Sequence, residues 1–289
     1  RLVLNAGDYG LAVQERAELI MLSDIAGYVG ADTCGCLLAI RQDQQEEISL
    51  MIDIGTNGEM VLGNRQRMVT CSTAAGPAFE GAKIECGMRG AAGAVDHVKY
   101  EDGKWNYTTV GNKPAVGLCG SGLIDLVAGL LDAGMLDENG VLRSGQEKQG
   151  VFILVPPERG GNERGVYLTQ KDLGEVQFAK AAIAAGIQML MERLGITEDD
   201  ICSVYIAGAF GNYMDSVSAG KIGLLPATLV KKVKPVGNAA GEGAKIALVN
   251  EKEMLEMDEL VRKIEFVELA ASADFQDHFI DELGFETGE

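Results

Sequence analysis

The chain has 289 residues, of which 47% are hydrophobic, so it is long enough for two domains and can form a sizeable core. Asp and Glu outnumber Lys and Arg by 43 to 25, and the resulting formal charge of −18 argues against a nucleic-acid-binding protein. No apolar run approaches the ~20 residues of a membrane-spanning helix and no signal peptide is visible, so we expect no membrane association.

The beginning of the chain is expected to be a lead-in to the main domain. The first residue is Arg1 rather than Met, and we interpret the sequence as a piece of a longer protein. Within residues 1–47 we predict a short strand at 19–22. The glycines at 27–30 are expected to open a helix that runs over 33–40.

Three short antiparallel strands joined by tight turns are predicted next, at 48–54, 59–62 and 67–71. The first strand delivers Asp53 to its end, and a Gly-Thr-Asn-Gly hairpin follows at 55–58. Phosphate binding needs glycines for close backbone approach, amides and a hydroxyl as donors, and a carboxylate to hold Mg²⁺ through water. The segment therefore indicates a phosphate site, although Asn-Gly is also a turn signal of any β-hairpin.

Helices alternate with strands in the rest of the chain. The longest predicted helix covers 171–194, where apolar side chains recur at spacings of three and four and Gly195 follows as a terminating glycine. This alternation predicts an α/β domain with a mixed sheet. The other expected elements are a Gly- and Ala-rich stretch at 74–93, strands within 94–116, a helix at 121–133, loops at 144–150 and 156–165 around a strand at 151–155, strands at 201–206, 233–236 and 264–269, and helices at 239–249, 254–262 and 274–283.

Three further glycine-rich segments could approach a ligand. The strand at 201–206 ends in small residues and glycines, which leave room for an adenine or a ribose against the backbone, but a plain strand-to-helix turn of small residues explains them equally well. The glycines of 236–244 open a helix, whose N-terminus is a natural anion site, and the alternative is that they serve close helix–sheet packing. At 117–122 a Gly-Ser-Gly turn precedes a helix, and there we expect Ser121 to act as the N-cap.

The cysteines and histidines do not suggest a metal site. No Cys-x-x-Cys pair exists, and the cysteine density is too low for a disulfide scaffold, so we expect reduced thiols that are mostly buried. Neither His97 nor His278 has metal-ligand spacing or the partners of a Ser-His-Asp triad. The six cysteines are Cys34, Cys36, Cys71, Cys86, Cys119 and Cys202.

The order of these segments resembles the acetate and sugar kinase/Hsp70/actin superfamily, in which two related β-β-β-α-β-α-β-α halves enclose ATP. More closely, residues 26–32, 52–59, 71–81 and 205–212 resemble the reductive activators of corrinoid proteins. The stretch Cys-Ser-Thr-Ala-Ala-Gly-Pro-Ala-Phe-Glu-Gly at 71–81 is long enough to be specific. The resemblance covers nearly the whole chain.

This resemblance implies an actin-like, ribonuclease H-like ATPase fold with a mixed sheet and insertions. Residues 1–47 would form a lead-in strand and a connecting helix. Residues 48–289 would form the nucleotide-binding subdomain, the second half of the ATPase domain, with an insertion around 74–170. Family members also carry an N-terminal [2Fe-2S] ferredoxin-like domain and an earlier Asp-Ile-Gly-Thr segment, neither of which precedes Asp53 here.

The implied activity is ATP-dependent reduction of cob(II)alamin to cob(I)alamin on a partner corrinoid protein of a methyltransferase system. The implied cofactors are ATP and Mg²⁺, with a [2Fe-2S] cluster only in a missing upstream domain. The expected location is the cytoplasm, and a homodimer is one compatible assembly. By resemblance, Asp53 is assigned to catalysis and to Mg²⁺ through water, Gly55, Thr56, Asn57 and Gly58 to phosphates, and Gly208, Ala209, Phe210, Gly211, Gly237 and Asn238 to adenosine.

Ser72 is predicted to contact the corrinoid partner. We expect it in an exposed loop beside the ATP cleft, where its hydroxyl would be a weak neutral ligand able to displace water from cobalt. The alternative is a buried serine that caps the turn at 77–81. The sequence does not identify the corrinoid partner.

Two other functions remain open at this point. A small-molecule kinase on the same fold would need a general base near an acceptor pocket, and the sequence offers no distinct candidate. A non-catalytic, nucleotide-sensing scaffold is compatible with the acidic composition and the incomplete set of motifs.

Overall fold

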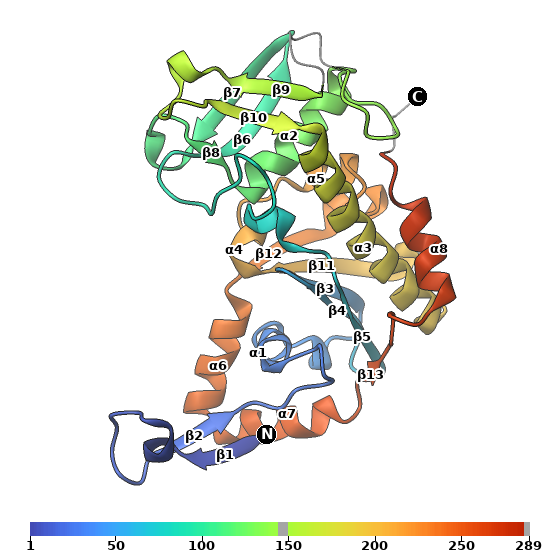
Figure 1. Ribbon diagram of the computed structural model, residues 1–289. Coiled ribbons are helices and arrows are strands. Elements are labelled where there is room, and N and C mark those ends of the chain that lie inside the picture. Colours follow the sequence, from blue (N-terminus) through green and yellow to red (C-terminus); the bar gives the residue numbers. More distant parts are fainter. Residues whose placement is uncertain (144–149, 286–289) are drawn as a thin grey trace.

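The computed structural model describes residues 1–143 and 150–285, which form a central mixed sheet with helices on both of its faces (Figure 1). Most of the loop expected at 144–150 lies outside the described residues. Among the residues that are described, no helix combines the length and apolar character needed to cross a bilayer.

The central sheet has the strand order β12-β11-β3-β4-β5-β13. The predicted meander is present, because β3, β4 and β5 pair antiparallel in sequence order. Three later strands extend it in parallel, β11 beside β3, β12 beside β11, and β13 beside β5. The strands are β3 (Ile48–Ile54), β4 (Gly58–Gly63), β5 (Met68–Thr73), β11 (Ile201–Ala207), β12 (Val233–Gly237) and β13 (Glu265–Phe266).

Both faces of this sheet are buried, which explains why β3 is apolar along almost its whole length. Leu50 and Ile52 point to one core, and Met51 between them points to a second core on the opposite face. Asp53 shares the side of Met51, so its carboxylate faces the second core's helices.

The long helix α3 (Gln170–Leu194) covers the first face, as the periodicity predicts. Thr169 and Asp172 form a capping box at its start, and Gly195 ends it in a left-handed conformation with φ 69°. The helix α8 (Ala273–Asp281) lies along α3, where the rings of Phe178 and Phe279 stack with centroids 6.1 Å apart (Figure 1).

Helices α1 (Ala31–Ile40), α6 (Ala239–Val249) and α7 (Glu251–Val261) cover the second face. Helices α1 and α6 cross at very short range, because a Cβ atom on Gly243 would lie only 1.9 Å from the carbonyl oxygen of Gly35. Gly243 therefore allows two helices to pack closely, whereas the alternative expected from the sequence is packing of a helix on the sheet. A hairpin of β1 (Leu2–Asn5) and β2 (Glu18–Met21) adjoins these helices.

A separate group of strands lies above the sheet in Figure 1. Trp105 joins its two small sheets, since its ring lies 4.9 Å from the rings of both Tyr100 and Phe152. These elements fall within the stretch expected as an insertion around 74–170, whose limits stay a prediction. They are β6 (Ala94–Glu101), β7 (Lys104–Thr109), β8 (Gly117–Leu118), α2 (Gly120–Asp132), β9 (Val151–Val155) and β10 (Val166–Thr169).

Some local predictions were wrong. Helix α2 has Cys119 at its N-cap, and Ser121 lies inside its first turn, where the hydroxyl donates to the carbonyl oxygen of Asp96 at 2.8 Å. Ser121 is therefore not the N-cap. The strand expected at 264–269 is reduced to two residues, because its pairing with β5 covers only Val69 and Thr70.

The remaining elements are short. They are α4 (Gly208–Gly211), α5 (Ser216–Lys221), and the 3₁₀ turns η1 (Ala6–Tyr9), η2 (Gln42–Gln44), η3 (Pro77–Glu80), η4 (Val110–Asn112), η5 (Pro157–Arg159), η6 (Glu198–Asp200) and η7 (Ala227–Lys232).

Candidate functional site

One row of residues crosses five neighbouring strands near the edge where the three parallel strands β3, β11 and β12 end. The register pairs Gly237 with Ala207, Ala207 with Asp53, Asp53 with Glu59, and Glu59 with Ser72. Open α/β sheets bind ligands outside the carboxyl ends of their strands, so this edge is the natural place for a site. Three of the predicted site residues, Asp53, Ser72 and Gly237, lie in this single row.

Asp53 is partly buried and has no cationic partner among the described residues. Burial raises the pKa of its carboxyl group, and the nearby carboxylate of Asp32 raises it further. The thiol of Cys36 donates to Asp53 Oδ2 over 3.9 Å, and burial together with Asp53 raises the pKa of that thiol to about 12, so Cys36 is a protonated donor. The folded chain thus holds Asp53 where a cation would stabilise its charged form.

Two more carboxylates approach Asp53. Burial raises the pKa of Glu59, and the charges of Asp32 and Asp53 raise it too, while the hydroxyl of Ser72 opposes them by donating to Glu59 Oε1 at 3.2 Å. Asp32 comes from the first turn of α1. Sequence reasoning gave neither Asp32 nor Glu59 a role of its own. The register of β3 and β4 places Glu59 opposite Asp53, and the packing of α1 on the sheet adds Asp32.

This acidic group does not by itself complete a metal site. The described residues contain no group of three or more His, Cys, Asp or Glu side chains placed to hold an ion. Mg²⁺ commonly takes only one or two carboxylates and fills its other positions with water and substrate phosphates. A half-buried carboxylate with a raised pKa fits that role, so Asp53 is compatible with Mg²⁺ bound together with a nucleotide.

The hairpin after Asp53 is closed by its own backbone. The amide of Gly55 donates to the carbonyl oxygen of Asn57 at 2.9 Å, and Thr56 and Asn57 are exposed. Thr56 is also tied to a distant segment, since its carbonyl oxygen accepts from the amide of Gly76 at 2.8 Å. Gly58 is buried, and a Cβ there would lie 2.9 Å from Thr73 Oγ1, which gives this glycine a packing reason.

The segment after β11 also reaches the row. Gly208 has φ +86°, and a Cβ built on it would lie 3.1 Å from Asp53 Oδ1, so only glycine suits this position well. Gly211 packs tightly on Ile206, since a Cβ built on Gly211 would lie only 2.6 Å from the side chain of Ile206. The side chain of Ala209 lies outside the part that the structure describes. Phe210 stacks on Phe79, with ring centroids 5.7 Å apart.

The loop that opens α6 is held by side-chain amides. Gly237 has φ +60° and faces the amide group of Asn212, which would lie 3.2 Å from a Cβ there. Asn238 caps α6, because its Oδ1 accepts from the amide of Gly241 at 2.9 Å. The side-chain oxygen of Asn238 is therefore already used within the protein.

A cavity of about 530 Å³ opens beside Phe210. Its walls include the aromatic rings of Phe79, Phe210 and Tyr213, and charged side chains of Glu80 and Arg89 stand at its lining. This volume is in the range of small-molecule pockets, which are mostly apolar with a few polar groups. Apart from Phe210, none of these residues was singled out from the sequence, because they come from three segments that meet only in the folded chain.

Ser72 lies in a different setting from the one predicted. It belongs to β5 rather than to a loop, because β4 and β5 stay paired as far as Gly58 and Thr73. It does not cap the turn at 77–81 either, since its hydroxyl donates to Glu59. Both the expected loop and the alternative turn cap were wrong, but Ser72 is half-buried in the same row as Asp53.

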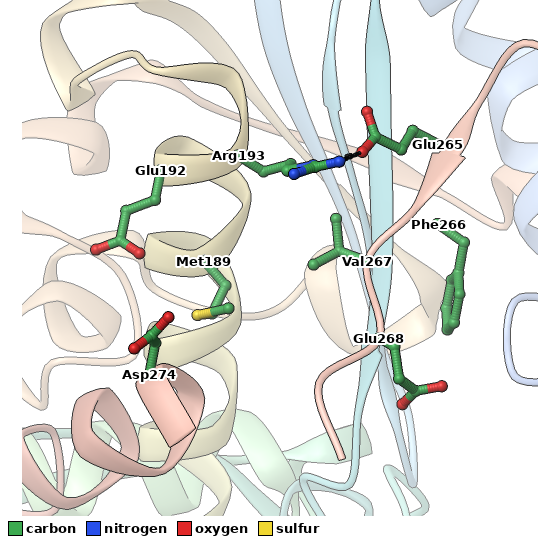
Figure 2. Close-up of a pocket in the computed structure, with 8 residues that line it drawn as sticks. All are labelled: Met189, Glu192, Arg193, Glu265, Phe266, Val267, Glu268 and Asp274. Atoms are coloured by element: carbon green, nitrogen blue, oxygen red, sulfur yellow. Dashed lines mark hydrogen bonds and ion pairs between the residues drawn. The ribbon is translucent and has the colours of Figure 1, made fainter. Parts of the chain in front are cut away.

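A second cavity of about 440 Å³ lies near the opposite edge strand, between α3, β13 and α8 (Figure 2). Glu192, Glu265, Glu268 and Asp274 surround it, and Arg193 is paired with Glu265 (Figure 2). None of the predicted site residues lines it, so it is not the site that the sequence indicates.

A three-stranded meander continued by two parallel strands, with a glycine hairpin after the first strand, defines an actin-like nucleotide-binding domain. Residues 47–289 match the family model described as the C-terminal domain of RACo, the ASKHA domain, and the chain belongs to this family. The predicted fold class and the predicted family are therefore confirmed.

Individual relatives agree with this assignment. The corrinoid activation enzyme RamQ of Eubacterium limosum is 36% identical over 96% of this chain and 49% of its own length. A [Co(II) methylated amine-specific corrinoid protein] reductase of Methanosarcina barkeri is 29% identical over 96% of this chain and 54% of its own length. A solved structure named reductive activator for corrinoid, iron-sulfur protein has a TM-score of 0.90 and 38% identity, and covers 98% of this chain and 47% of that one. The chain thus spans about half the length of these relatives.

Proposed function

We propose that this chain is the ATP-binding portion of an enzyme that drives reduction of cob(II)alamin to cob(I)alamin on a partner corrinoid protein. The names of the relatives support corrinoid activation over a small-molecule kinase or a non-catalytic scaffold. We place the protein in the cytoplasm, a compartment compatible with cysteines that are free and mostly buried among the described residues.

One observation carries the nucleotide assignment. A carboxylate with no ion pair among the described residues, a glycine hairpin and a largely apolar cavity adjoin each other at one edge of the sheet. Asp53 would hold Mg²⁺ through water, and the amide and hydroxyl of Thr56 would hold phosphates, since the amide of Gly55 is used within the hairpin. The cavity walled by Phe79 and Phe210 would take the adenine ring. Glu80 joins the two parts, because it lines the cavity and accepts from the Thr56 hydroxyl at 2.7 Å.

The carboxylates around Asp53 limit which groups could bind phosphates at this site. Asp32, Asp53 and Glu59 repel a phosphate chain, and Arg89 is the cationic side chain at the lining of the cavity. Phosphate binding would therefore rest on backbone amides and on a cation shared with Asp53. This arrangement supports binding of the magnesium complex of ATP rather than of free ATP.

The proposal is tested with the full-length protein, a candidate corrinoid protein and a chemical reductant, by following the cob(II)alamin absorption. We expect loss of the cob(II)alamin signal that requires both ATP and Mg²⁺. Reduction at the same rate without ATP would contradict the proposal. ATP-dependent phosphorylation of a small molecule, with no effect on cobalt, would favour a kinase instead.

A further inference from the structure

Glu80 holds the hydroxyl of the phosphate hairpin from a distant part of the chain. Thr56 Oγ1 donates to Glu80 Oε1 at 2.7 Å, although 24 residues separate the two. The carboxylate also lies near the bend of the hairpin, since a Cβ built on Gly55 would be 3.9 Å from the same oxygen. Both side chains are exposed, so the contact stands open to a ligand at the hairpin.

The turn that carries Glu80 does not need this contact to close. Within η3 and its end, the amide of Gly81 donates to the carbonyl oxygen of Ala78 at 3.0 Å, and the amide of Ala82 donates to that of Pro77 at 3.1 Å. Gly76 anchors the segment to the hairpin through the backbone of Thr56. The side-chain contact between Glu80 and Thr56 is therefore an addition to a turn that the backbone already defines.

The charge of Glu80 works against phosphate at this place. No ion pair of Glu80 with a cationic side chain exists within 1–143 and 150–285. A phosphate that takes a hydrogen bond from Thr56 must replace Glu80, because the hydroxyl has one proton to donate. It must also overcome repulsion from a carboxylate a few ångströms away.

We propose that Glu80 is a phosphate-sensing residue, which holds the Thr56 hydroxyl until a nucleotide phosphate replaces it. The inference rests on the proposed nucleotide site and adds a residue that discriminates phosphorylated ligands from the nucleoside. Release of Glu80 changes the lining of the 530 Å³ cavity, to which its side chain belongs.

The test compares Glu80→Gln with the parent in the full-length protein, by calorimetric binding of MgATP, MgADP and adenosine. Gln keeps the size and the acceptor oxygen but removes the charge. We expect affinity for MgATP and MgADP to rise by about tenfold, because a neutral amide oxygen holds the Thr56 hydroxyl less tightly than a carboxylate does, while adenosine affinity stays the same. The matched control is Glu158→Gln, an exposed glutamate in η5, which should change none of the three affinities.

A second pair of variants tests competition for the hydroxyl. In a Thr56→Val background, Glu80→Gln should change MgATP affinity by less than about threefold, because the hydroxyl for which Glu80 and phosphate compete is gone. An equal rise in adenosine affinity would mean that Glu80 only shapes the cavity, and would overturn the inference. Weaker MgATP binding with unchanged metal-free ATP binding would make Glu80 a metal ligand, which also overturns it. If the parent binds no nucleotide at all, the proposed function itself fails.

Discussion

Asp53 lies directly opposite Glu59 across the β3–β4 ladder, so two carboxylates face each other in one row of the sheet. The pKa of each of these two carboxyl groups is raised, mainly by burial, and the charge of Asp32 raises both further. Like charges opposite each other destabilise a sheet, and no cationic side chain forms an ion pair with either group among the described residues. Such an arrangement is typical of a functional site rather than of a structural one.

Replacing Asp53 by Ala in the full-length protein should lower MgATP-dependent turnover by about 10²-fold or more, the loss of one electrostatic contact at a phosphoryl site. The thermal midpoint should stay the same or rise, because a partly buried, repelled charge is removed. ATP hydrolysis and thermal unfolding measure the two effects. Asp199→Ala is the control, since this exposed residue precedes β11 at the end opposite to Ala207. Unchanged hydrolysis in Asp53→Ala would refute the phosphate assignment.

The stability of the folded chain should fall as pH rises through the raised carboxyl pKa values. The folded state binds protons at Asp53 and Glu59 more tightly than the unfolded state, whose values are near 3.8 and 4.5. The stability that these two groups contribute is therefore fully present below the pKa values of the unfolded state. It is lost as the pH rises through the raised pKa values of the folded state. Chemical unfolding across about pH 4 to pH 8 measures this, and the Asp53→Asn/Glu59→Gln double variant should show a shallower dependence. An identical pH dependence in parent and double variant would contradict the proposed desolvation.

Gly208→Ala should weaken MgATP and MgADP binding together, because the added methyl group meets Asp53 at 3.1 Å and any non-glycine residue is strained at φ +86°. The strain alone should cost about 1–2 kcal/mol of stability. Gly103→Ala provides a matched control, since Gly103 has φ +74° with nothing within 4 Å of a Cβ. It should lose similar stability and keep its nucleotide affinity. If both variants bind ADP like the parent, Gly208 serves packing alone.

Gly243→Ala should destabilise the chain by about 1–3 kcal/mol, the usual cost of forcing extra volume into packed structure. The new methyl group would lie 1.9 Å from the carbonyl oxygen of Gly35, so α6 must move away from α1. Gly174→Ala in α3 is the counterpart, because nothing lies within 4 Å of its Cβ. It should stabilise by about 0.5–1 kcal/mol through helix propensity. Urea unfolding measures the stability of both variants. Equal free energies of unfolding for the two variants would disprove the close contact.

Ser72→Ala in the full-length protein should leave ATP binding intact but weaken activation of the corrinoid protein or alter the cob(II)alamin spectrum of the complex. Loss of the hydroxyl also removes the hydrogen bond that lowers the pKa of Glu59. Ser72→Thr retains a hydroxyl and should behave like the parent. Should the spectrum and the reduction rate of Ser72→Ala both match the parent, Ser72 is structural and the partner surface lies elsewhere.

The sequence by itself determined the features that depend on local spacing. The meander from Ile48 to Thr73 follows from short apolar runs separated by turn residues, and α3 follows from a regular apolar stripe ended by Gly195. Asp53 and its hairpin could be found in the same way, because a carboxylate near the end of an apolar strand is followed directly by a glycine turn.

Only the tertiary structure decided which side chains surround Asp53 and its hairpin. Asp32 reaches Asp53 through the packing of α1, and Glu80 reaches Thr56 through a turn 24 residues away. Phe79, Phe210 and Tyr213 meet around one cavity although the first lies far from the other two in the sequence. Ser72 belongs to a strand and not to a loop because β4 keeps pairing with it. The periodicity of a sequence predicts on which face of its own helix or strand a residue lies. Strand register and helix packing join distant segments, and they decide which residues that face contacts.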